Sequence, residues 1–222
     1  GKFLGIGLIP SDCESPGDHM DRLASDGGIV GFRLSSLGGP ADPLAPVDVR
    51  TFETYPIWNR AAEKDYVLWL YPGAVDAQVC AFLIDAFPQV RVVFNHLMVC
   101  PGQGRFSWDG LGRPKIDTPM PPISRHSIHN LYQYENVHVL LSGQYAFSKE
   151  SYPYADLAAW HQSLRSKFGA RRLMWATDFP WILEEPGYGP LVRVIDEMIP
   201  DLSEEERAEI MGETARRVLR FR

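Results

Sequence analysis

Short apolar runs alternate with longer segments of helical period along the whole of this 222-residue chain. The runs are apolar throughout rather than at every second residue, a pattern typical of parallel strands that are covered on both faces. Strict alternation of strands and helices predicts an α/β fold whose parallel sheet is connected by right-handed crossovers. The predicted strands span 3–9, 29–34, 66–71, 91–95, 137–142 and 172–176. The predicted helices lie near 17–26, 50–63, 75–87, 123–134, 154–168, 189–199 and 204–220.

Both an open doubly wound sheet and a closed (β/α)8 barrel, the TIM barrel, satisfy this alternation. The glycine pairs Gly38-Gly39 and Gly102-x-Gly104 have the wrong spacing for the phosphate loop of a dinucleotide or P-loop site. Polar residues follow several different strands, which is where barrel enzymes carry their chemistry. We therefore predict the barrel.

The number of predicted units leaves that barrel incomplete. A TIM barrel has eight β/α units and typically about 250 residues, whereas about six units are predicted within this chain. Because the first predicted strand starts at residue 3, we expect the first two β/α units to be the missing ones. No linker rich in Gly and Ser divides the sequence, so residues 1–222 are predicted to form a single domain.

The composition of the chain argues against a nucleic acid or a membrane as its partner. The formal net charge of −6, without a long run of one sign, argues against a nucleic-acid partner, which would require a basic face. No apolar stretch reaches the roughly 18 residues of a membrane helix, and no charged-then-apolar leader is present. The three cysteines are far apart, which argues against a disulfide framework. We expect a cytoplasmic protein that acts on a small molecule.

Two strands are followed by residues that can carry hydrolytic chemistry. His96 follows strand 91–95, where an imidazole can serve as a metal ligand or general base, although a histidine satisfied by its neighbours is an alternative. Asp178 follows strand 172–176 and precedes Phe179-Pro180-Trp181, whose rings would partly desolvate the carboxylate. This favours Asp178 as a base or metal ligand over the alternative of a helix cap or turn former.

Other strand ends supply candidate substrate-binding residues. Arg33 ends the second strand, where its guanidinium could pair with a substrate carboxylate or bridge two loops. Tyr71 and Tyr145 follow two further strands and are candidates for the mouth of the barrel, with Trp181 as a wall. The sequence contains no Gly-x-Ser-x-Gly, Cys-x-x-Cys or His-x-His motif, so a serine or cysteine nucleophile has no support.

These motifs resemble the amidohydrolase-related family of the amidohydrolase superfamily, whose members are TIM-barrel hydrolases. The run Val92-Val93-Phe94-Asn95-His96-Leu97 is similar to the family's strand that ends in Asp-His-Leu or Asn-His-Leu. The block Arg172-Leu173-Met174-Trp175-Ala176-Thr177-Asp178-Phe179-Pro180-Trp181 is the most specific similarity. Further similar segments are 31–34, 136–143, 152–157, 168–169 and 206–217.

The resemblance implies that the six strands are the third to eighth of the barrel, so that His96 ends strand six and Asp178 strand eight. Family members add a His-x-His pair from strand one and often a ligand from strand five, and together these bind a divalent metal, usually zinc or manganese. By resemblance Asp178 would hold the metal or take a proton from water, and His96 would be a ligand or stabilise the oxyanion. The strand-one pair is absent here, and the strand-five equivalent 68–71 has no histidine. In the lactonase-like branch that histidine is commonly missing, and some members work without metal.

Three hypotheses remain. The leading one is a hydrolase of a small carboxylate-bearing substrate, most simply a lactone of a sugar acid or of an aromatic breakdown product, with Asp178, His96 and Arg33 in its site. The second is a metal-dependent non-oxidative decarboxylase of the same family, against which the missing strand-five histidine counts. The third is an inactive truncated barrel, whose exposed sheet edges would favour a homo-oligomer.

Overall fold

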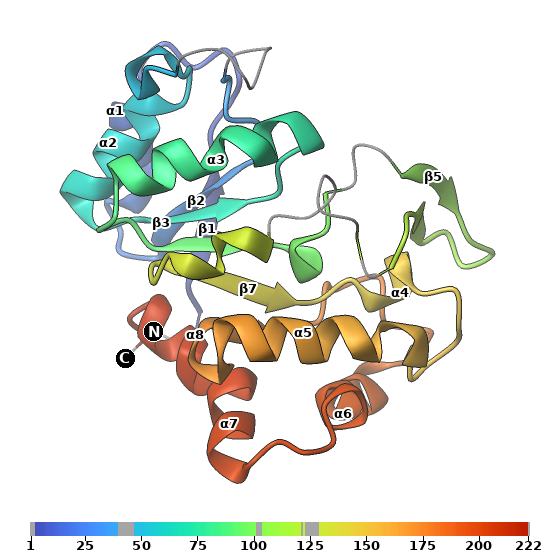
Figure 1. Ribbon diagram of the computed structural model, residues 1–222. Coiled ribbons are helices and arrows are strands. Elements are labelled where there is room, and N and C mark those ends of the chain that lie inside the picture. Colours follow the sequence, from blue (N-terminus) through green and yellow to red (C-terminus); the bar gives the residue numbers. More distant parts are fainter. Residues whose placement is uncertain (1–2, 40–46, 101–103, 121, 123–128, 222) are drawn as a thin grey trace.

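The computed structural model describes residues 3–39, 47–100, 104–120, 122 and 129–221 (Figure 1). Its centre is a parallel sheet with the strand order β1-β2-β3-β4-β7-β8. In Figure 1, α1 to α3 lie beside the first strands of this sheet and α5 to α8 beside the last ones. The sheet strands are β1 (Gly5–Leu8), β2 (Ile29–Leu34), β3 (Val67–Leu70), β4 (Val92–Phe94), β7 (Val137–Leu141) and β8 (Leu173–Trp175). The helices are α1 (Pro16–Ala24), α2 (Tyr55–Lys64), α3 (Ala74–Ala86), α4 (Gln144–Phe147), α5 (Ala158–Phe168), α6 (Tyr188–Met198), α7 (Glu204–Ala208) and α8 (Thr214–Val218).

The six predicted strands form and pair in sequence order, so the prediction of a parallel α/β sheet is confirmed. Alternate residues of β3, β4, β7 and β8 face two different clusters. Phe32, Leu70 and other residues of one face pack against the helices. Val67 and Val93 face the opposite side, where Val218 of α8 covers them. Burial on both faces explains why the strands read as unbroken apolar runs.

Two helix predictions differ from the structure. Residues 123–128 of the predicted helix 123–134 lie outside the described part of the chain, and His129–Gln133 forms a 3-10 helix instead of an α-helix. The predicted helix 204–220 is divided into α7 and α8 by a π-helical turn at Glu209–Glu213. Its start is held by a capping box, because Ser203 Oγ accepts from the amide of Glu206 and the Glu206 carboxylate accepts from the amide of Ser203.

A feature that the sequence pattern did not predict is an antiparallel hairpin of β5 (Arg105–Trp108) and β6 (Pro114–Asp117). Its turn is organised by Asp109, whose Oδ1 accepts from the amides of Leu111 and Arg113 at 2.9 Å each. Gly112 supplies the left-handed residue of the turn, with φ of 69°. The hairpin extends from the sheet on the side where the parallel strands end. No helix in the described ranges is both long enough and apolar enough to cross a membrane.

Candidate active site

A cavity of about 260 Å³ lies at the carboxyl ends of the parallel strands. The six residues that the sequence singled out all line it: Arg33, Tyr71, His96, Tyr145, Asp178 and Trp181. They come from five different strand ends, and the hairpin closes the cavity with Phe106, Pro114 and Ile116. The structure therefore gathers every candidate site residue at the end of the sheet where parallel α/β proteins bind their ligands.

His96 and Asp178 face each other across this cavity. The distance from His96 Nδ1 to Asp178 Oδ2 is 3.9 Å, and the two side chains are 16% and 23% exposed. Both residues have a left-handed backbone, with φ of 48° for His96 and 55° for Asp178. Such a conformation costs a non-glycine residue roughly 1–2 kcal/mol, and strain of this kind concentrates at functional sites.

The His96 ring is fixed by three neighbours. Ser142 Oγ lies 3.0 Å from Nδ1, and the edge of the ring meets Tyr71 with 4.8 Å between ring centroids. Gly143 closes the third side, because a Cβ at this position would lie 2.9 Å from Nδ1. Burial lowers the pKa of His96, and the nearby Asp178 carboxylate opposes this effect. We infer that the imidazole is neutral at pH 7.

Tyr145 provides the hydrogen bond to the Asp178 carboxylate. Its phenol donates to Asp178 Oδ2 at 2.7 Å, and its side chain is buried. Burial raises the pKa of Tyr145, and the hydrogen bond to Asp178 raises it further. The phenol consequently stays protonated and remains a donor over the working pH range. No described residue donates a hydrogen bond to the second carboxylate oxygen, Oδ1.

Arg33 lines the cavity and forms no ion pair with the described part of the chain. Its guanidinium carbon lies 6.0 Å from the centroid of the Tyr71 ring. Among the described residues no carboxylate forms an ion pair with Arg33, which is exposed. Burial also raises the pKa of Tyr71, so this phenol is neutral beside the guanidinium. A free guanidinium against an aromatic ring can bind a carboxylate through two parallel hydrogen bonds.

Trp181 and the hairpin form an aromatic wall. The Trp181 ring lies 6.1 Å from that of Trp108, which in turn contacts Phe106 at 5.2 Å. Trp181 was predicted from the sequence, whereas the hairpin residue Phe106 was not. Ser142 was not predicted either, although it ends the predicted strand 137–142. Its position at a strand end was the one feature that could have indicated a role, since a single serine has no characteristic spacing.

The described residues fall short of a complete metal site. His96 and Asp178 supply one nitrogen and one carboxylate donor, but the described residues contain no group of three or more His, Cys, Asp or Glu side chains able to hold an ion. A catalytic zinc site takes three protein ligands and a water molecule. The donor set of these residues does not fit a metal on its own.

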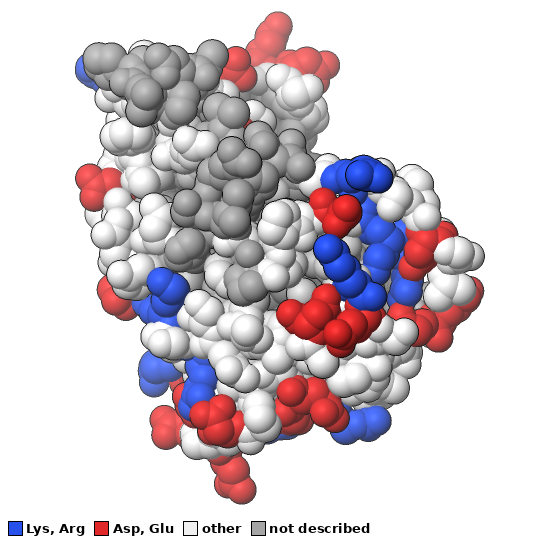
Figure 2. All heavy atoms as spheres, turned by 45° about the vertical axis from the view of Figure 1, so that its right-hand side comes forward, with Lys and Arg blue, Asp and Glu red and all other residues white. Residues whose placement is uncertain are grey.

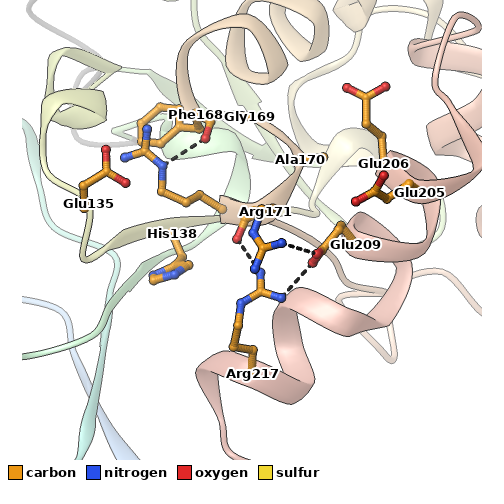
Figure 3. A pocket seen from close by; sticks show the side chains of 11 residues that line it. Glu135, His138, Phe168, Gly169, Ala170, Arg171, Glu205, Glu206, Glu209 and Arg217 are labelled. Atoms are coloured by element: carbon orange, nitrogen blue, oxygen red, sulfur yellow. Dashed lines mark hydrogen bonds and ion pairs between the residues drawn. The ribbon is translucent and has the colours of Figure 1, made fainter.

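A larger cavity of about 680 Å³ lies near the amino ends of β7 and β8, away from these residues (Figure 3). Three of its charged side chains pair with one another: Glu209 accepts from Arg217 at 2.9 Å and forms an ion pair with Arg171 at 3.4 Å. The amino-terminal end of a parallel barrel sheet is associated with stability rather than catalysis. We assign this network to the attachment of the C-terminal helices.

Comparisons with known proteins identify the family of the chain. The sequence matches the family model described as amidohydrolase over residues 1–221, which is nearly the whole chain. Comparison with curated proteins gave no match.

Similar solved structures share the fold. A Pseudomonas putida protein assigned as a 2-pyrone-4,6-dicarboxylic acid hydrolase is 22% identical with a TM-score of 0.65, and the match covers 98% of this chain and 72% of that one. The 2,6-dihydroxybenzoate decarboxylase from Rhizobium is 18% identical with a TM-score of 0.60, covering 98% and 71%. An amidohydrolase from Burkholderia multivorans with bound zinc is 22% identical with a TM-score of 0.59, covering 90% and 69%. The predicted TIM-barrel type of fold is confirmed, with six of its strands present here.

Proposed function

We propose a lactone substrate for this chain, which belongs to the amidohydrolase family and is a hydrolase by that membership. The observation that carries the proposal is the arrangement of one cavity: a carboxylate lies beside an imidazole, and the same cavity is lined by a guanidinium that pairs with no described carboxylate. Such a site can activate water and at the same time bind a substrate that carries a carboxylate. The lactone hydrolase among the similar structures points in the same direction.

In this proposal Asp178 is the general base. Tyr145 donates to Oδ2 and stabilises the charged form of the carboxylate, and Oδ1 is left to accept a proton from water. The hydroxide equivalent forms the new C–O bond at the lactone carbonyl carbon. When the tetrahedral intermediate collapses, the ring C–O bond breaks and the proton held by Asp178 passes to the leaving oxygen. One water is consumed and one hydroxy acid is formed, so the carboxylate is regenerated.

His96 is assigned to the carbonyl oxygen. If the Ser142 hydroxyl donates to Nδ1, the proton of the neutral imidazole resides on Nε2, where it can donate to the developing oxyanion. A donor that is fixed before the reaction stabilises the transition state without reorganising. Ser142 and Gly143, which hold the ring, would preserve this orientation.

Arg33 is assigned to the substrate carboxylate, with Tyr71 and Trp181 as walls for the ring. A cavity of about 260 Å³ suits a single ring with small substituents. Zinc or manganese could still join His96 and Asp178 if a further ligand is supplied from outside the described residues. We propose the cytoplasm as the setting, which the unpaired Cys13, Cys80 and Cys100 support.

The second candidate is a decarboxylase, which is favoured by the similarity to the 2,6-dihydroxybenzoate decarboxylase fold. One assay separates the two functions. The purified chain is incubated with 2-pyrone-4,6-dicarboxylate, with D-saccharic acid 1,4-lactone and with 2,6-dihydroxybenzoate, each with a chelator and with added zinc or manganese. Ring opening supports the proposal, and release of carbon dioxide alone from 2,6-dihydroxybenzoate contradicts it.

The decisive variant is Asp178→Asn, which keeps the shape of the side chain and removes the base. Because general base catalysis typically contributes about 10²- to 10⁴-fold, we expect hydrolysis to fall by about that factor. Asp85→Asn is the matched control, since Asp85 is exposed near the carboxyl end of α3 and does not line the cavity. Equal activity of Asp178→Asn and the wild type would exclude Asp178 as the base.

A further inference from the structure

Two cations of the β5–β6 hairpin contact one residue of the candidate site, Tyr145. Lys115 Nζ donates to the carbonyl oxygens of Tyr145 at 2.5 Å and Ser148 at 2.9 Å. The guanidinium carbon of Arg113 lies 5.4 Å from the centroid of the Tyr145 ring. Figure 2 shows basic side chains bordered by acidic ones over the hairpin side of the molecule. The hairpin thus contacts both the backbone and the ring of the residue that donates to Asp178.

Arg113 is held in this place from two directions. Its Nε donates to Asp109 Oδ2 at 2.8 Å within the hairpin. Its Nη1 donates to the backbone oxygen of Glu185 at 2.6 Å and to the Glu185 carboxylate. The Arg113 side chain is 12% exposed, so these charge-assisted bonds are partly shielded from water. Arg113 therefore joins the hairpin to the loop after β8, next to the ring of Tyr145.

A cation next to the ring acts on the phenol. The positive charge of Arg113 lowers the pKa of Tyr145, against the stronger effects of burial and of Asp178, which raise it. A more acidic phenol is a stronger donor, so the guanidinium strengthens the hydrogen bond to Asp178 Oδ2. The other charged or titratable groups that act on this phenol are Asp178 itself and Tyr71.

We propose that Arg113 is a positioning residue for the Tyr145–Asp178 pair. Docking of the hairpin through Arg113 holds the phenol on Oδ2 of Asp178, which leaves Oδ1 for the attacking water. This inference rests on the proposed function, in which Asp178 is the base. A role confined to hairpin stability, through Asp109 and Glu185, is the alternative that the experiment must separate.

A double-mutant cycle makes that separation. Arg113→Met removes the charge and keeps the alkyl stem, and Tyr145→Phe removes the phenol oxygen and keeps the ring. We expect Arg113→Met to lower kcat of lactone hydrolysis about tenfold, in the range of a partly desolvated cation–π contact, and to have little further effect in the Tyr145→Phe background. An equal loss in both backgrounds would overturn the proposal. Arg105→Met, on the same hairpin but exposed, is the matched control and should retain wild-type kcat.

A second readout does not depend on activity. The chain is labelled with tyrosine carrying ¹³C at Cζ, and the Tyr145 resonance is assigned by its loss in Tyr145→Phe. We expect Arg113→Met to shift this resonance and Arg105→Met to leave it in place. Glu185→Gln weakens the outer anchor of Arg113 without touching Tyr145, so it should shift the resonance in the same direction and carries the test if Arg113→Met does not fold.

The kinetic and the NMR readout test the lactonase function and the positioning role of Arg113 separately. A shifted resonance in a wild-type chain that opens no lactone would contradict the proposed function while supporting the contact between Arg113 and the phenol. A resonance unmoved by both Arg113→Met and Glu185→Gln would overturn the positioning role, even in an active lactonase.

Discussion

Gly143 leaves no room for a side chain against His96, since a Cβ on Gly143 would lie 2.9 Å from Nδ1 and 3.2 Å from Cγ of the imidazole. Its φ of 74° is also a conformation that L residues rarely adopt. Gly143, which follows β7, therefore fixes the imidazole of His96, which follows β4. A glycine is required at this position for two independent physical reasons.

Gly143→Ala should displace His96 and reduce activity more than stability. The left-handed alanine costs about 1 kcal/mol or slightly more, and the His96 ring must move to relieve the contact. We expect kcat/KM for lactone hydrolysis to fall at least tenfold, because small displacements of a catalytic group are costly. Steady-state kinetics and thermal unfolding on the same sample check this expectation.

Gly27→Ala is the matched control for that variant. Gly27 has a similar φ of 73°, but a Cβ there would meet no atom within 4 Å. This control should have a lower melting temperature, because an alanine at positive φ is strained, and it should leave kcat/KM unchanged. If both variants lose the same activity, backbone strain explains the effect and the contact with His96 does not.

Tyr145→Phe should lower the rate of hydrolysis, because Asp178 loses the group that holds its carboxylate in place. The phenol donates to Asp178 Oδ2 at 2.7 Å, and phenylalanine keeps the ring but removes this donor. A hydrogen bond to a charged group contributes roughly 1.5–3 kcal/mol, so we expect kcat/KM for lactone hydrolysis to fall about tenfold or more. Tyr132→Phe, at a half-exposed ring outside the cavity, is the control. Equal kcat/KM for Tyr145→Phe and the wild type would argue that the phenol does not position Asp178.

The strands and the candidate residues were predictable because each depends on local sequence. An unbroken apolar run shows a strand that is covered on both faces, and a polar residue directly after it lies at the carboxyl edge. His96, Asp178 and Arg33 were found in this way. Their distances to one another were not predictable, since they depend on the curvature of the sheet and on the register between strands.

The parts that escaped prediction depend on long-range contacts. Ser142 became relevant only when the fold placed it 3.0 Å from His96, which is 46 residues away. The position of the Arg113 side chain depends on its hydrogen bond to the backbone oxygen of Glu185, which is 72 residues away. The hairpin itself was overlooked because β5 and β6 are short and one of them begins with a proline.

Arg33→Met should affect substrate binding without destabilising the fold. Arg33 is exposed and pairs with no described carboxylate, so its loss leaves no buried charge behind. Charge-assisted hydrogen bonds contribute roughly 1.5–3 kcal/mol, and we expect KM for a carboxylate-bearing lactone to rise about 10- to 100-fold. For a lactone without a carboxylate, such as D-glucono-δ-lactone, KM should be unchanged. An equal effect on both lactones would contradict the assigned role.

His161 and His138 should make the fold sensitive to mild acid. Burial lowers the pKa of each histidine to about 4 in the folded chain, whereas an unfolded histidine titrates near 6.5. Between these two pH values the unfolded state binds protons that the folded state does not, so stability falls as the pH is lowered from about 6.5 toward 4.

The size of that loss can be tested with a single variant. The difference between the folded and unfolded pKa values corresponds to a loss of at most about 3 kcal/mol of unfolding free energy per histidine. Urea unfolding at pH 7 and at pH 4.5 measures this loss. His161 is fully buried, its ring nitrogens contact the Leu157 carbonyl oxygen and the Gln144 side chain, and it forms no ion pair with a described carboxylate. His161→Gln should therefore be less stable than the wild type at pH 7 and should lose about half as much stability on acidification. His19→Gln, at the surface of α1, should retain the full wild-type slope. If His161→Gln keeps the same slope as the wild type, the acid sensitivity arises from other groups, and a neutral buried imidazole at position 161 is not its source.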